Sequence, residues 1–269
     1  MLHTASRIRS RLLRLSFGLA LLTGACDGDP STSDAGTSDD AGAADAGPGE
    51  VDAGPPRMVE CIDQSISMLQ LFDTPASGAI ADESTGDGSF RNHIDATGGG
   101  MSPTEAFVYA RFEDTGLVKV EIDDDAAFES TAWDIAFRRF VVRINSGVSG
   151  PSNVTGARTA PGTTFDALTA VPDGLSYRDE AYFTDTCEYV PDGSGIGSPQ
   201  TALSSFWSYA GRVAMTGNVF VPQLASGRHV KLEVLSYYSP DVQTSCNETD
   251  TISSPPGAGN LRIRWAFLD

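Results

Sequence analysis

Cysteine and histidine are the residues of this chain that could hold a metal or form a covalent bond, and both are scarce. The sequence contains four cysteines and three histidines. The cysteines form no C-x-x-C pair and have no neighbouring histidine, so their spacing predicts no zinc site. We therefore predict no metal ligands among these residues.

No catalytic constellation is present either. The chain lacks H-E-x-x-H, G-x-S-x-G and a P-loop, and a Ser-His-Asp arrangement would need His93 or His229 beside an unmarked serine. We expect no catalytic residues and no enzyme activity. Two acidic clusters, Asp123-Asp124-Asp125 and Asp82-Glu83 with Asp87, could offer oxygen ligands to Ca²⁺. Neither has EF-hand spacing, so solvated loop carboxylates are the favoured interpretation.

The first of the cysteines ends a targeting signal. Four arginines precede an apolar run over 15–25 that is too short to span a bilayer, since ten residues of helix rise only about 15 Å. Leu22-Thr23-Gly24-Ala25-Cys26 resembles a bacterial lipobox, in which the cysteine receives a diacylglycerol. We predict a lipoprotein signal peptide over 1–25 and lipidation at Cys26; the alternative is an ordinary secretory signal cleaved at an A-x-A-like site.

A linker follows the signal. Residues 26–56 contain eight acidic residues, no basic residue and a recurring Asp-Ala-Gly. Such a segment cannot bury enough apolar surface to offset its ordering entropy, so we expect it to be disordered. With the lipid, it predicts a membrane-anchored protein of the bacterial cell envelope, the outer membrane or cell surface being favoured over the inner membrane. The net charge of -18 excludes nucleic acid as a partner.

The remaining cysteines form an odd set. With Cys26 lipidated, Cys61, Cys187 and Cys246 are left in an oxidising compartment where disulfides persist. Cys187 and Cys246 both lie in polar, loop-like segments and are the first candidates for a disulfide. Cys61 would then be the unpaired thiol.

The rest of the chain, 57–269, is predicted to be one all-β domain. Residues 106–120 contain two extended runs around Asp114-Thr115-Gly116 and predict a hairpin. Residues 218–221 and 229–238 flank a second turn, and 133–145 read as one long half-buried strand. In the last strand, Leu261, Ile263, Trp265 and Phe267 share one face. With no long helical pattern, this favours an antiparallel β-sandwich-like architecture.

One stretch carries a family resemblance. Residues 133–140, W-D-I-A-F-R-R-F, followed by Arg143-Ile144-Asn145-Ser146-Gly147 and Ser149-Gly150, resemble the signature strand and turn of the HmuY family of haem-binding lipoproteins. The hairpin before it, residues 231–238 and the closing strand agree in order. The signature itself reads as structural: Trp133 and Phe137 are expected on one strand face, and 145–150 supply turn chemistry.

Membership would imply a hand-shaped all-β domain that binds haem and could pass it to an outer-membrane receptor. Haem iron takes His, Met, Tyr or Cys as axial ligands, but 182–215 contains no histidine. Met215 and Tyr209 are the available substitutes there, and His229 is a further candidate. The alternative is a HmuY-like structural or protein-interaction lipoprotein that binds no haem.

Overall fold

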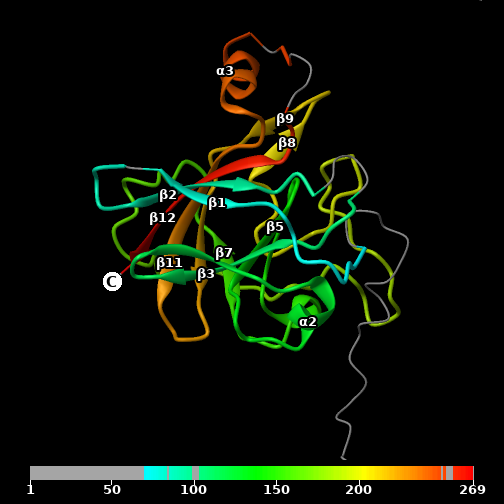
Figure 1. The fold of residues 1–269 in the computed structure, drawn as a ribbon. Coiled ribbons are helices and arrows are strands. Elements are labelled where there is room, and N and C mark those ends of the chain that lie inside the picture. Colours follow the sequence, from blue (N-terminus) through cyan, green and yellow to red (C-terminus); the bar gives the residue numbers. More distant parts are fainter. Residues whose placement is uncertain (1–69, 84, 99–102, 250, 253–256, 269) are drawn as a thin grey trace, which may run out of the picture. The chain divides into compact units, whose positions relative to one another are not determined.

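The computed structural model describes residues 70–83, 85–98, 103–249, 251–252 and 257–268. The predicted signal peptide (1–25), the linker (26–56), Cys26 and Cys61 lie outside these ranges. Within them the chain is built mainly from antiparallel strands, as the periodicity of two predicted (Figure 1). Of the helices in this part of the chain, none is both long and apolar enough to cross a bilayer.

The larger sheet has six strands in the order β1-β2-β12-β11-β10-β7. These strands are β1 (Ile80–Glu83), β2 (Phe90–Asp95), β12 (Asn260–Leu268), β11 (His229–Ser236), β10 (Val219–Gln223) and β7 (Thr155–Arg158). Every neighbouring pair is antiparallel. The turn between β10 and β11 confirms the second predicted hairpin, with Gly227 at a positive φ of 86°.

The second sheet has four strands in the order β4-β3-β5-β6: β4 (Gly116–Val120), β3 (Val108–Glu113), β5 (Ile135–Arg138) and β6 (Val141–Ile144). The β3–β4 hairpin confirms the first prediction. A separate two-stranded ribbon consists of β8 (Trp207–Tyr209) and β9 (Val213–Met215). The helical elements are α2 (Asp124–Phe128), the 3-10 turn η1 (Gly147–Ser149) and α3 (Pro240–Thr249).

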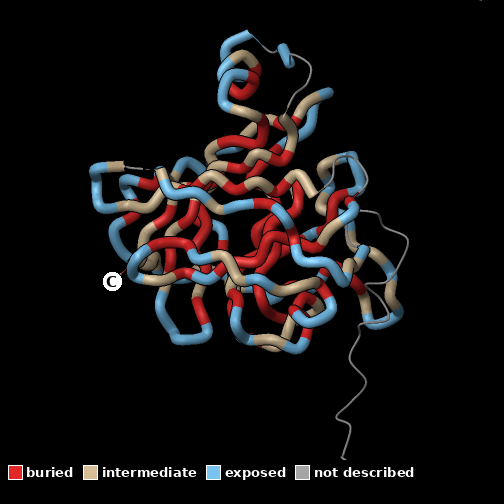
Figure 2. The backbone as a smooth tube through the Cα atoms, viewed as in Figure 1, coloured by how far each residue is buried: buried red, intermediate tan, exposed pale blue. Residues whose placement is uncertain are grey.

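The main core lies between the two larger sheets, because one cluster of buried side chains draws on both. Alternate residues of β12, including Ile263 and Trp265, meet alternate residues of β3 and β5, including Phe112 and Phe137. The rings of Phe112 and Trp265 lie edge to face with centroids 4.9 Å apart. In Figure 2 the buried segments follow the strands, and the connecting loops are mostly exposed. This packing confirms the sandwich-like all-β prediction.

The opposite face of the four-stranded sheet carries a second apolar cluster. It contains Phe107, Tyr109 and Trp133, together with residues of α2 and Tyr182 from the loop after β7. A third, smaller cluster packs Phe165 and nearby loop residues against the outer face of β10 and β12. Each sheet therefore has apolar side chains on both faces, so strict alternation of apolar and polar residues is lost in β5 and β6.

The prediction of one long strand over 133–145 is wrong. The segment forms β5 and β6, which pair antiparallel around a tight turn at Arg139 and Phe140. Arg139 takes a positive φ of 53°. Arginine rarely adopts this conformation, so the residue type gave no signal of a turn here. Both strands are also buried along their whole length, including Arg138 on β5 and Arg143 on β6. Trp133 precedes β5 and packs in the second cluster, whereas Phe137 packs in the main core, so the two do not share a face.

The closing strand behaves largely as predicted. Leu261, Ile263 and Trp265 are buried in the main core, and Arg262 and Arg264 are half-buried on the other face. Trp265 donates its indole N–H to Oδ1 of the buried Asn92 on β2 at 2.8 Å, which satisfies both polar groups inside the core.

Candidate functional site

The β8–β9 ribbon positions two of the three predicted haem ligands. Trp207 pairs with Met215, and Tyr209 pairs with Val213. Because alternate residues of a strand share a face, all four side chains lie on one face of the ribbon. Met215 and Tyr209 are diagonal neighbours there, a relation that places their Cα atoms roughly 7–8 Å apart. Met215 is half-buried against the main core, and Tyr209 is 45% exposed.

Local hydrogen bonds hold this ribbon in place. Gly211, with a φ of 78°, turns the chain at its tip. At its base, Thr216 and Asn218 donate side-chain hydrogen bonds to the carbonyl of Ser205 at 2.8 and 2.7 Å. The backbone N–H of Val213 donates to the Tyr238 hydroxyl at 3.0 Å, which ties the ribbon to the end of β11. The ribbon is thus a fixed platform with one exposed aromatic side chain.

The third predicted ligand lies elsewhere. His229 begins β11, and the strand runs seven residues further to Ser236, about 23 Å at the rise of an antiparallel strand. The ribbon contacts the far end of β11 through Tyr238. His229 packs near Tyr177, with ring centroids 5.9 Å apart. It therefore cannot share an iron with Met215 or Tyr209. His93 is on β2, where its Nε2 lies 3.1 Å from Oδ1 of Asn260.

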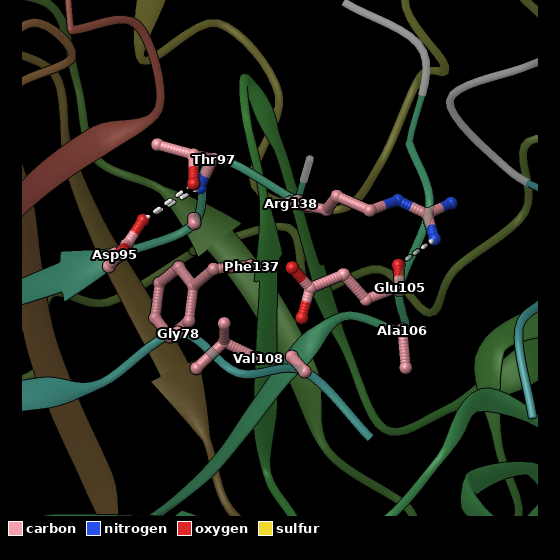
Figure 3. A pocket seen from close by; sticks show the side chains of 11 residues that line it. Gly78, Asp95, Thr97, Glu105, Ala106, Val108, Phe137 and Arg138 are labelled. Carbon is pink, nitrogen blue, oxygen red and sulfur yellow. Dashed lines mark hydrogen bonds between the residues drawn. The ribbon is translucent and has the colours of Figure 1, made fainter. Parts of the chain in front are cut away.

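The three candidates line none of three pockets formed by described residues alone. The most enclosed of these is a cavity of about 10 Å³ beside Gly78, Phe137 and Arg138 (Figure 3), room for about one water molecule. In Figure 3 the guanidinium of Arg138 extends away from this cavity to the carbonyl of Glu105. A tetrapyrrole does not fit there. The ribbon offers donor atoms suited to an iron: the thioether of the half-buried Met215 and the phenol of the exposed Tyr209.

A buried charge cluster is the feature that sequence reasoning missed. Asp124, expected in a solvated loop, is fully buried at the start of α2. Its carboxylate lies 3.3 Å from Nη1 of Arg138 and 3.6 Å from Nη2 of Arg143. It also accepts hydrogen bonds from the Tyr109 hydroxyl at 2.7 Å and from the backbone N–H groups of Phe107 and Phe72 at 3.0 and 3.1 Å. Its neighbour Asp123 caps α2 instead.

Aromatic faces complete the surroundings of the two arginines. The guanidinium carbons of Arg138 and Arg143 lie 3.9 and 4.0 Å from the ring centroid of Phe107. Arg143 also faces Trp133 at 5.9 Å, and its Nη2 donates to the Tyr109 hydroxyl. Its Nε and Nη1 have no hydrogen-bond acceptor among the described residues, so the rings supply the remaining contacts. Burial lowers the pKa of Arg138 to about 10.

Glu180 extends this interior polar region toward the loop after β7. Its two carboxyl oxygens accept the backbone N–H groups of Ile144 and Ala202, both at 2.9 Å. It therefore satisfies the edge of β6 and fastens the loop to it. Burial raises the pKa of Glu180 to about 7, against the opposing effect of these hydrogen bonds and of Arg143.

The turn after β6 is set by close contacts. Asn145 donates its side-chain amide to the carbonyls of Ser130 and Trp133, both at 2.9 Å. A Cβ at Gly147, whose φ is 52°, would lie 2.1 Å from the carbonyl oxygen of Glu180, and one at Gly150 would lie 2.2 Å from Oδ1 of Asn145. Only glycine fits at these positions. The signature residues thus hold the fold together, as the sequence indicated.

The predicted disulfide between Cys187 and Cys246 is wrong. Cys246 lies in α3, with its side chain buried and its thiol free. Cys187 is disulfide-bonded, and its partner lies outside the described residues. The sequence around Cys246 was interpreted as a polar loop because α3 has few apolar residues. The helix nevertheless buries Cys246 against the main core.

Carboxylates of the acidic clusters pair with protein groups. No group of three or more His, Cys, Asp or Glu within the described ranges is arranged to bind one. Asp82 accepts from Asn92 at 2.6 Å, Glu83 pairs with Arg262 at 2.7 Å, and Asp87 pairs with Arg264 at 2.7 Å. Their carboxylates fasten β1 and the following loop to the large sheet.

The two packed sheets, the buried signature strands and the exposed ribbon define an all-β, sandwich-like protein. The family model described as HmuY protein matches residues 104–249, more than half of the chain. This protein belongs to the HmuY family. No curated protein sequence matches the chain significantly.

Solved structures show weaker likenesses. A protein proposed to be a HmuY-like haem-binding protein of Bacteroides vulgatus ATCC 8482 is 18% identical, with a TM-score of 0.43 over 69% of this chain and 95% of that one. A proposed lipoprotein of Bacteroides fragilis NCTC 9343 is 13% identical, with a TM-score of 0.43 over 68% and 91%. An apo HmuY analogue of Tannerella forsythia is 15% identical, with a TM-score of 0.38 over 73% and 100%.

Proposed function

We propose that this protein is a lipid-anchored binding protein of the bacterial cell envelope that captures haem or a related tetrapyrrole without catalysing a reaction. The observation that carries the proposal is the HmuY family match over 104–249, which includes both the signature strands and the β8–β9 ribbon. One solved structure of similar fold is named as a proposed HmuY-like haem-binding protein.

The ribbon supplies the binding residues in this proposal. Met215 offers a thioether and Tyr209 a phenol from the same face, and both are axial ligands known in haem proteins. Met215 is the first choice, because it is half-buried and held by the core, whereas Tyr209 is exposed and close enough to contact the same ligand. His229, at the other end of β11, has no part in it. Bound haem would supply the iron that these atoms ligate.

The N-terminus determines location in this proposal. A lipid on Cys26 would anchor the chain, and about thirty flexible residues would give the domain a reach on the order of 30 Å from the bilayer. Such a reach suits transfer of a ligand to an outer-membrane receptor. The anchor is tested by metabolic labelling with a fatty acid: label in the wild-type chain and its loss in Cys26→Ser support lipidation.

A second function is a HmuY-fold interaction lipoprotein that binds no haem. It is favoured by one observation: Tyr209, the aromatic one of the two candidate ligands on the ribbon, is 45% exposed. The two functions differ in what the exposed face of the ribbon would contact, a planar cofactor or another protein.

A haem titration followed by Soret absorbance in the oxidised and reduced states separates the two. We expect a saturable, shifted band that Met215→Leu weakens, because leucine keeps the volume and removes the sulfur. Tyr209→Phe tests the second donor, and His229→Ala is the control that should leave the band unchanged. Absence of a saturable band in the wild-type protein in either redox state would refute haem binding and leave the interaction function.

A further inference from the structure

A polar pocket of about 330 Å³ is lined by residues of β7 and of the loop that follows it, and it includes none of the candidate haem ligands. Its walls carry two arginines, one aspartate and four neutral hydrogen-bonding residues: Arg158, Arg178, Asp192, Ser176, Gln200, Ser204 and Ser205. We call it the arginine pocket. Apolar side chains are absent from this set, so it does not suit a planar hydrophobic ligand.

A single backbone bridge brings the segments that carry the two arginines together. Gly156 of β7 forms an antiparallel bridge with Arg178, with both N–H···O hydrogen bonds at 2.9 Å. Arg158 lies two residues further along β7. Both arginines and Ser176 line the pocket, so they border the same polar space.

Hydrogen bonds to the wall of the pocket fix the side chain of Arg178. Its Nη2 donates to the carbonyls of Thr201 and Ala202, at 3.5 and 3.1 Å. Gly156 lets β7 approach this wall closely, because a Cβ there would lie 3.0 Å from Leu203 and 3.3 Å from Ala202. The backbone contacts use one nitrogen of the guanidinium, and the remaining N–H donors are free to bind a ligand.

Arg158 contributes a positive charge that no described carboxylate pairs with. It is exposed on β7, an edge strand, and has no ion-pair partner within the described part of the chain. Asp192 is the single acid in the pocket, and its Oδ1 accepts the N–H of Ser194 at 2.8 Å. Two cations and one anion line the pocket, in a chain whose net charge is -18, and the carboxyl of the buried Glu180 also interacts electrostatically with Arg178. A local positive excess in so acidic a protein attracts anions.

We propose that the arginine pocket binds a small ligand through an oxyanion, the carboxylate or phosphate group that a guanidinium fork recognises with two parallel hydrogen bonds. Arg158 and Arg178 contact the anion. The hydroxyls of Ser176 and Ser204 donate to its remaining oxygens, and Asp192 excludes ligands with further negative charge on its side. The site uses none of the candidate haem ligands, so it stands independently of haem binding.

Two titrations followed by ¹H–¹⁵N NMR test the site, one with inorganic phosphate and one with succinate. We expect saturable shifts at amides of the pocket, and the tighter of the two anions identifies phosphate or carboxylate as the recognised group. Arg158→Ala should weaken binding at least about tenfold, the loss expected for a charged hydrogen bond. It should not unfold the protein, because Arg158 makes no described ion pair. Arg178→Lys, which keeps charge but loses the fork, should weaken it as well.

Arg111→Ala is the matched control, since Arg111 is an exposed strand arginine far from the pocket in sequence and paired with Glu113. It should leave binding unchanged. The proposal is overturned if neither anion gives saturable shifts, if Arg158→Ala binds as tightly as the wild type, or if Arg111→Ala weakens binding equally. The last result would mean general attraction to surface arginines.

Discussion

Replacing Asp124 by asparagine is expected to cost most of the stability of the domain. Asp124 contacts both Arg138 and Arg143, and all three side chains are fully buried. Asparagine keeps the shape but removes the charge, and its NH₂ group cannot accept from the donors that now point at the carboxylate. Breaking a buried ion pair by removing one partner costs about 3–5 kcal/mol. Here two guanidinium groups lose their counter-ion, so we expect the upper end of that range.

Urea denaturation followed by tryptophan fluorescence measures the loss as a lower midpoint at an unchanged slope. The control is Asp125→Asn, one residue along the same helix, where the side chain is exposed. Surface substitutions of this kind stay within about 0.5 kcal/mol. If Asp124→Asn lost less than about 1 kcal/mol, the carboxylate would not be the counter-ion of the buried arginines, and the reasoning would fail.

Three further outcomes follow from the interior. The raised pKa of Glu180, about 7 against an ordinary 4.5, means that the native state holds a proton that the unfolded chain releases. Its contribution to stability is therefore complete below pH 4.5 and is lost as pH rises through about 7, and Glu180→Gln should flatten the change in urea midpoint over that window. Gly147→Ala should destabilise by about 1–3 kcal/mol, through the positive φ and the contact with Glu180, and a midpoint equal to wild type would contradict the contact. In non-reducing peptide mapping, Cys187 should be recovered linked to Cys61, since Cys26 is the expected lipid site. Cys246 should be alkylated only after unfolding, and rapid labelling of the native protein would show that its burial is wrong.

The strand pattern could be predicted from sequence where local chemistry decides it. Val108–Glu113 and Gly116–Val120 are strands because apolar and β-branched residues flank a turn with a glycine. The prediction of one strand over 133–145 was wrong for a physical reason. The residue that turns the chain there, Arg139 at a positive φ, has no turn propensity, and the turn is imposed by the packing on either side of it.

The candidate haem ligands also divide into those that the sequence could indicate and those that only the structure could test. Residue types and the absence of histidine pointed to Met215 and Tyr209, and the structure brings these two to one face of the ribbon. His229 could not be excluded from sequence, because its distance from them is set by the length and direction of β11. The arginine pocket had no sequence signal at all, since Arg158 and Arg178 are brought together by a single bridge.

The sequence by itself determined the features that depend on composition and short-range pattern: the signal and acidic linker as predictions, the all-β class, the hairpins and the family signature. Only the tertiary structure decided which charges are buried and with what. Asp124 sits in a run of three aspartates that reads as solvent-exposed, yet its partners come from β3, β5 and β6. Cys246 likewise looks like a loop residue and is a core residue. The cost of burying such groups is offset by partners distant in the chain, so no local pattern can report it.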